Sequence, residues 1–217
     1  MIRLLLRDTT AILRGLVLAL AVWSAGAAQA QATQTAEEFV RTQAPAALAT
    51  LNNPRLTTAD RTREFQRLMT QVADLDRIAF FVLGRYGRTF PRDRYPEYLR
   101  TFREYALVVY QTQLDQYRGD AVRVIRSETD RSGDTIVYTQ IPSKARGETL
   151  EAVWRVRTGP NGPRVIDVRV FGVWLAIQQK SDFEAVINRA ANQPEAIIAH
   201  MRNFVATAQT ERGWRPG

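Results

Sequence analysis

Two stretches decide the fold of this chain: Thr-Leu-Glu-Ala-Val-Trp-Arg-Val-Arg at 149–157 and Arg-Val-Ile-Asp-Val-Arg-Val-Phe at 164–171. Both alternate apolar and polar residues, a pattern typical of strands with one buried face. The apolar set consists of Leu150, Ala152, Trp154, Val156, Ile166, Val168 and Val170. Because Gly-Pro-Asn-Gly-Pro separates the two stretches, they predict an antiparallel hairpin that is covered on one side.

Two earlier segments extend this hairpin into a larger sheet. Residues 121–128 and 135–141 also alternate with a period of two, and the turn-forming sequence Asp-Arg-Ser-Gly lies between them. A second turn-rich sequence, Pro-Ser-Lys-Ala-Arg-Gly, precedes residue 149. The pattern therefore predicts an antiparallel meander of four to five strands.

Helices are predicted on both sides of this meander. Before it, we expect helix starts at Thr35 and Thr57, where a hydroxyl precedes a carboxylate by three residues, and at Asp74 or Asp76. A longer helix is expected over about 93–117. After the meander, helices are expected to begin at the capping sequences that start with Ser181 and Asn192.

This order predicts a single α+β domain without linkers or repeats. The sheet is expected to form a cradle that N-terminal and C-terminal helices cover on one face. The predicted domain covers 31–210, and 211–217 is expected to be a loose tail.

The N-terminus has the composition of a secretory signal. Arg3, Arg7 and Arg14 precede the apolar run 15–23, and Ala28-Gln29-Ala30 ends the segment with an A-x-A pattern. The apolar run is too short to span a membrane, so an uncleaved anchor is the weaker alternative. We predict a signal peptide over 1–30, with cleavage near Ala30 and export of the mature chain.

The composition excludes several classes of site. The 217 residues include no cysteine and one histidine, His200, which excludes disulfides, zinc–thiolate sites and multi-histidine metal sites. No phosphate-binding loop, dinucleotide-binding motif or nucleophile elbow is present. We therefore expect a protein that is not an enzyme and has neither a cofactor nor a metal. A hydrolase that uses Asp76 or Asp167 is the remaining catalytic alternative.

The basic charge does not indicate a nucleic-acid partner. The net charge is +8, and all but two of the 30 basic residues are arginine. These arginines are spread along the chain without a basic run, as on a solvated surface. The aromatic and aliphatic residues leave two interpretations open: a filled core, or a cavity for an apolar ligand between sheet and helices.

Two motifs resemble a known family. Residues 76–86, Asp-Arg-Ile-Ala-Phe-Phe-Val-Leu-Gly-Arg-Tyr, resemble the D-x-x-I-A-x-x-V-L-G-x-x signature of the MlaC (toluene-tolerance) family of periplasmic phospholipid-binding proteins. Residues 167–183, Asp-Val-Arg-Val-Phe-Gly-Val-Trp-Leu-Ala-Ile-Gln-Gln-Lys-Ser-Asp-Phe, are similar to its D-V-x-x-x-G-V-S-L-x-x-x-Y-R-x-x-F segment. The family's F…Y…L…Y helix is matched by Phe102, Tyr110, Leu114 and Tyr117. The resemblance covers about 36–205.

The resemblance implies a monomeric lipid carrier in the periplasm. Such a carrier exchanges phospholipid between an outer-membrane lipoprotein–porin complex and the membrane-anchored substrate-binding subunit of an inner-membrane ABC transporter, and so maintains outer-membrane lipid asymmetry. The expected lipid-binding residues are Ile78, Val82, Phe102, Tyr105, Tyr110, Trp154, Val156, Ile166, Val168, Val170, Val173, Trp174 and Leu175. Lys180 and Arg85 are expected near the headgroup.

Three positions depart from the family pattern. Trp174 stands where the family has serine, Gln179 where it has tyrosine, and Lys180 where it has arginine. These differences fit a divergent branch, and since a hopanoid-associated branch of the family exists, a hopanoid-type lipid is an alternative cargo. A second alternative, from a different class, is an exported adaptor protein with a filled core.

Overall fold

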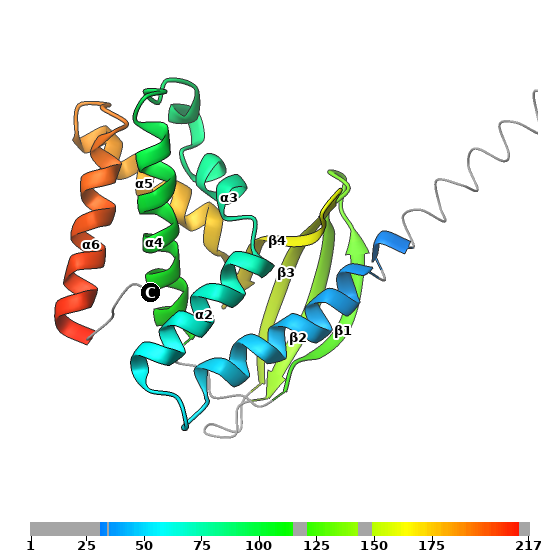
Figure 1. The fold of residues 1–217 in the computed structure, drawn as a ribbon. Coiled ribbons are helices and arrows are strands. Elements are labelled where there is room, and N and C mark those ends of the chain that lie inside the picture. Colours follow the sequence, from blue (N-terminus) through cyan, green and yellow to red (C-terminus); the bar gives the residue numbers. More distant parts are fainter. Residues whose placement is uncertain (1–30, 34, 115–120, 143–148, 213–217) are drawn as a thin grey trace, which may run out of the picture.

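The fold is that of a computed structural model, which describes residues 31–33, 35–114, 121–142 and 149–212 (Figure 1). The predicted signal peptide and residue Tyr117 lie outside these ranges. The chain is α+β, with one antiparallel sheet and a group of helices beside it, so the predicted fold class is confirmed.

The sheet is a meander in which each strand pairs with the next along the chain. Its order is β1-β2-β3-β4-β5, and every pair is antiparallel, as the alternating segments predicted. The strands are β1 (Arg123–Thr129), β2 (Thr135–Pro142), β3 (Thr149–Gly159), β4 (Gly162–Val170) and the short β5 (Val173–Trp174).

A bulge in β4 changes which residues face the helices. Arg155 pairs with Asp167, but the next residue, Val156, pairs with Val165, so Ile166 is the extra residue on β4. Val165 is consequently buried where simple alternation placed Ile166. The prediction that Ile166 shares a face with Val168 is wrong for this reason, because a period of two does not survive a bulge.

The helices form two groups. They are a helix that comprises residues 31–33 and 35–51, here called the first helix, α2 (Thr58–Val72), α3 (Leu75–Val82), the short 3-10 helix η1 (Gly84–Arg88), α4 (Tyr95–Leu114), α5 (Leu175–Arg189) and α6 (Ala196–Arg212). The first helix and α2 lie against the sheet, whereas α3, α4, α5 and α6 gather into a bundle at its side (Figure 1). The end of α6 lies two residues inside the predicted tail, and 213–217 lie outside the described residues.

Of the five predicted helix starts, two are confirmed and three are wrong. Thr57 accepts a hydrogen bond from the Asp60 N–H, and Asp74 accepts one from the Arg77 N–H, as N-cap residues do. Thr35, in contrast, lies inside the first helix and donates to the Gln31 carbonyl at 2.8 Å. Ser181 lies inside α5, which begins six residues earlier because a cap from β4 completes its first turn. Asn192 has a left-handed φ of 61° and lies four residues before α6 begins at Ala196, so it does not cap that helix.

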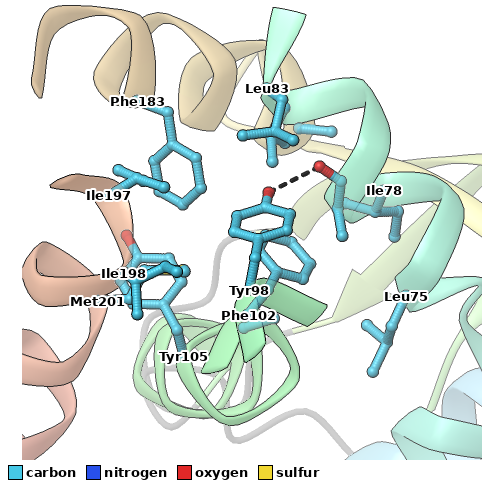
Figure 2. Close-up of a cluster of buried hydrophobic side chains, with 14 of the residues drawn as sticks. Leu75, Ile78, Leu83, Tyr98, Phe102, Tyr105, Phe183, Ile197, Ile198 and Met201 are labelled. Atoms are coloured by element: carbon cyan, nitrogen blue, oxygen red, sulfur yellow. Dashed lines mark hydrogen bonds between the residues drawn. The ribbon is translucent and has the colours of Figure 1, made fainter. Parts of the chain in front are cut away.

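The bundle contains the larger hydrophobic core (Figure 2). Tyr98, Phe102 and Phe183 are almost completely buried, and neighbouring ring centroids lie 6.0 Å and 6.2 Å apart. The Tyr98 hydroxyl donates to the Ala79 carbonyl at 2.7 Å, which satisfies its polar end and ties α4 to α3. The bundle core therefore packs aromatic rings together with aliphatic side chains.

Candidate functional site

An apolar cavity of about 80 Å³ lies between the sheet and the helices that cover it. The sheet contributes Ile141, Leu150, Ala152, Trp154, Val165, Val168 and Val170 to its wall. The register explains this set, because Trp154 pairs with Val168 and Ala152 pairs with Val170. Side chains of paired residues point to the same face of a sheet, so they form one continuous apolar surface.

The helices complete the wall with several small side chains. The first helix contributes Ala44, Ala47 and Leu48, and α2 contributes Met69 and Val72. Alanines leave space that a larger residue at the same helix position would fill. A smaller cavity of about 40 Å³ shares several of these residues and extends along the same helix toward Phe39 and Val40.

The polar groups in the sheet wall are satisfied internally. The Trp154 indole N–H donates to the Thr139 hydroxyl at 2.9 Å, and that hydroxyl donates to the Ala152 carbonyl at 2.8 Å. The wall thus presents mainly carbon to the cavity. Such a surface is suited to hydrocarbon rather than to a polar ligand.

Asp167 is the one charged residue among the side chains that line this cavity. One carboxylate oxygen accepts from the Ala176 N–H at 2.9 Å and from the Val168 N–H at 2.8 Å, so Asp167 caps α5 from the neighbouring strand. Burial raises the pKa of Asp167 to about 6, against the lowering effect of these hydrogen bonds and of Arg155. This carboxyl group is therefore a titratable element in an apolar wall.

The turn between β4 and β5 lies at the edge of the cavity. Phe171 has a φ of 51° and Gly172 a φ of 78°, which gives the tight two-residue connection that a hairpin of this length requires. Phe171 lines the cavity although 74% of its surface is exposed. Leu175, the first residue of α5, lines the cavity as well, so this turn and the start of α5 mark its mouth.

The structure brings together about half of the residues predicted to bind lipid. Those that line the cavity are Ile78, Tyr110, Trp154, Val168, Val170 and Leu175. Val156 is buried in the same layer without lining the cavity, and Ile166 is displaced from the wall by the bulge. Val173 and Trp174 do not line it either: Val173 is exposed, and the Trp174 ring lies against Arg169.

Other predicted residues lie in the helical bundle. Val82, Phe102 and Tyr105 belong to its core, and Phe102 and Tyr105 also line a separate groove beside α5. Lys180 lies over the Phe81 ring, and Arg85 donates to the Asn188 side chain. Lys180 and Arg85 are therefore outside the cavity wall.

Several wall residues were missed from the sequence. They are Ala44, Ala47, Leu48, Met69, Val72, Ala73, Ile141, Leu150, Ala152, Val165, Asp167 and Phe171. A signal for the first three exists, since Val40, Ala44, Ala47 and Leu48 follow the spacing of one apolar helix face. Their small size, however, is equally typical of a close helix contact.

Among the residues that the structure describes, no group of three or more His, Asp and Glu side chains could hold a metal ion. None of the helices in the same ranges has the length and hydrophobicity needed to cross a membrane.

A helix-covered antiparallel sheet with a carbon-lined cavity defines the class of α+β proteins that can enclose an apolar ligand. The family model described as "MlaC protein" matches residues 41–203. The chain therefore belongs to the MlaC family, as the two motifs predicted.

A solved structure supports the same fold. It is the phospholipid-binding protein from Ralstonia solanacearum in complex with a phospholipid, which is 21% identical to this chain. The similarity has a TM-score of 0.67 and covers 79% of this chain and 97% of the other. Comparison with curated proteins finds no match.

Proposed function

We propose that the protein is a periplasmic carrier that holds phospholipid acyl chains in the apolar cavity. The carbon-lined cavity between β3, β4 and the covering helices is the observation that carries this proposal. The fold it shares with a protein described in complex with a phospholipid supports it. In this proposal Ile78, Tyr110, Trp154, Val168 and Val170 contact the acyl chains.

The physical need for such a carrier follows from the cost of exposing lipid to water. A two-chain phospholipid has about 30 methylenes, and exposing each one costs about 0.8 kcal/mol. The total, on the order of 25 kcal/mol, makes free diffusion negligible. A protein cavity as apolar as a bilayer makes the transfer nearly neutral, so no covalent step, cofactor or metal is needed.

We further propose that the mature chain, from residue 31, works as a monomer between two membrane assemblies. One is an outer-membrane lipoprotein–porin complex. The other is the membrane-anchored substrate-binding subunit of an inner-membrane ABC transporter. Exchange between them would maintain outer-membrane lipid asymmetry. Family membership and the predicted signal peptide support this part of the proposal.

The size of the cavity implies that loading changes the structure. A volume of about 80 Å³ is well below the ~300–1,000 Å³ typical of ligand pockets. We therefore expect the first helix and α2 to move away from the sheet when lipid enters. At Ala44 and Ala47 the first helix makes a smaller apolar contact than larger side chains would, which lowers the cost of such a movement.

The proposal is tested by the lipid content of protein purified from a periplasmic fraction. Native mass spectrometry followed by solvent extraction is expected to show one bound phospholipid per chain. A bound molecule with the mass of a hopanoid would support the carrier function with a different cargo. A bare protein that also refuses lipid from vesicles would contradict the proposal and favour the adaptor.

A pair of variants ties this result to the cavity. Ala47→Phe fills the space, whereas Ala46→Phe adds the same ring to an exposed position on the same helix. We expect Ala47→Phe to lower the loading by about tenfold, which corresponds to about 1.4 kcal/mol. Equal loading of the two variants would place the lipid elsewhere.

A further inference from the structure

A groove of about 220 Å³ lies between α4 and α5, beside the apolar cavity. Tyr110 and Leu175 line both spaces, so the groove and the cavity are neighbours that share these two side chains as a common wall. The groove differs from the cavity in chemistry, because amide and carboxylate groups of α5 form one of its walls. The two spaces together match an amphipathic molecule with an apolar part and a polar end.

The polar wall carries a negative charge without a cation. Gln178 donates to an Asp182 carboxylate oxygen at 2.9 Å, and Gln179 accepts from the Tyr105 hydroxyl at 3.0 Å. Asp182 is exposed and forms no ion pair with any residue in the described ranges. The carboxylates of α2, of α3 and its N-cap, and Asp134 of the β1–β2 turn are, in contrast, paired with arginine. The groove therefore offers an uncompensated carboxylate.

Aromatic rings form the opposite part of the groove. Phe102 and Tyr105 come from α4, and Phe204 comes from α6 with 40% of its surface exposed. The Tyr105 and Phe204 ring centroids lie 5.0 Å apart. Aromatic rings attract ammonium groups through their quadrupoles, and a nearby carboxylate adds an opposite charge.

The neighbouring His200 does not neutralise the Asp182 carboxylate. The His200 ring lies 6.5 Å from Tyr105, centroid to centroid. Burial, followed by the charge of Arg189, lowers the pKa of His200, so the imidazole is neutral at pH 7. Tyr110, at the junction of the two spaces, has no hydrogen-bond partner for its hydroxyl among the described residues and can donate to a ligand oxygen.

We propose that the groove receives the lipid headgroup and selects headgroups that end in an ammonium group, with Asp182 as the counter-charge. This inference rests on the proposed carrier function. The acyl chains lie in the apolar cavity, the polar backbone of the lipid passes Tyr110, and the ammonium group lies between Asp182 and the aromatic rings.

The test offers the full mature protein a choice of headgroup within one membrane. Vesicles that contain phosphatidylethanolamine and phosphatidylglycerol in equal amounts are incubated with the protein, and the extracted lipids are quantified by mass spectrometry. We expect the wild-type protein to enrich phosphatidylethanolamine by about two- to fivefold. Asp182→Asn and Phe204→Ala are each expected to bring the ratio toward one.

A matched control separates the local charge from the net charge of the protein. Glu104→Gln removes one negative charge from an exposed position on α4 that does not line the groove, and it is expected to keep the wild-type ratio. An unchanged ratio in Asp182→Asn, or no enrichment by the wild type, would overturn the headgroup site while leaving the carrier function intact. If the wild type takes up neither lipid, both the headgroup site and the proposed carrier function are overturned.

Discussion

The helical bundle and the sheet layer both bury apolar side chains but are packed differently. In the bundle, Phe102 is 1% exposed and packs edge-on against Phe183. In the sheet layer, Ala44 of the first helix and Ala152 of β3 both line a cavity that their small side chains leave unfilled. One region is closely packed around several aromatic rings, and the other keeps an apolar space whose wall includes small side chains.

This difference assigns separate tasks to the two regions. A filled core gains dispersion and hydrophobic free energy from every contact and gives the domain its stability. An incompletely filled layer contributes less, but its two sides can separate at lower cost. In the proposed carrier, the closely packed bundle stabilises the domain and the incompletely filled layer admits the lipid.

The largest loss of stability is expected when a side chain of the bundle core is truncated. Phe102→Ala is expected to lower the free energy of unfolding by about 3–5 kcal/mol, because the surrounding helices cannot close the space. Urea denaturation measures this change. A loss below about 1 kcal/mol would show that the bundle is not the closely packed region.

The second effect concerns Asp167, which lies at the boundary of the two regions. Its pKa is raised from 3.8 to about 6, so the folded protein binds this proton more tightly than the unfolded chain. Stability should therefore fall as the pH rises from about 4 to about 6, and this carboxyl alone accounts for at most about 3 kcal/mol.

Asp167→Asn tests that expectation, because its amide oxygen can still accept from the Ala176 N–H but does not titrate. Free energies of unfolding are measured for both proteins between pH 4 and pH 7. Their difference isolates Asp167, since His200 is present in both. Parallel curves would mean that Asp167 titrates normally.

The smallest effect is expected in the sheet layer. Val168→Ala enlarges a cavity that already exists and is expected to cost only about 1 kcal/mol, well below Phe102→Ala. Urea denaturation under the same conditions gives the comparison directly. A loss as large as that of Phe102→Ala would show that both regions are packed equally tightly.

Much of the fold could be predicted because its signals are local. The alternation in β2, β3 and β4 and the caps at Thr57 and Asp74 depend on residues a few positions apart. The start of α5 could not be predicted, because the residue that caps it, Asp167, lies on strand β4 and not in the residues next to the helix start. The wrong face for Ile166 has the same origin, because the bulge forms only when β4 pairs with β3.

The residues of the candidate site also divide into those that a local pattern predicted and those that only the tertiary structure places. Trp154, Val168 and Val170 were found from the period of their strands, and Ile78 and Tyr110 from helix patterns and motifs. Phe102 and Tyr105 were placed in the same cavity, but the structure places them on the far side of Tyr110, in the α4–α5 groove. Periodicity assigns a residue to a face and does not say what lies opposite it.

The sequence by itself determined the α+β class, the meander, the family, and the absence of cysteine. Only the tertiary structure decided where the apolar side chains fill space and where they leave it empty. A core wall and a cavity wall have the same hydrophobic pattern. They differ in the sizes of the residues that meet across the gap, which come from segments far apart in the chain, such as Ala44 and Ala152.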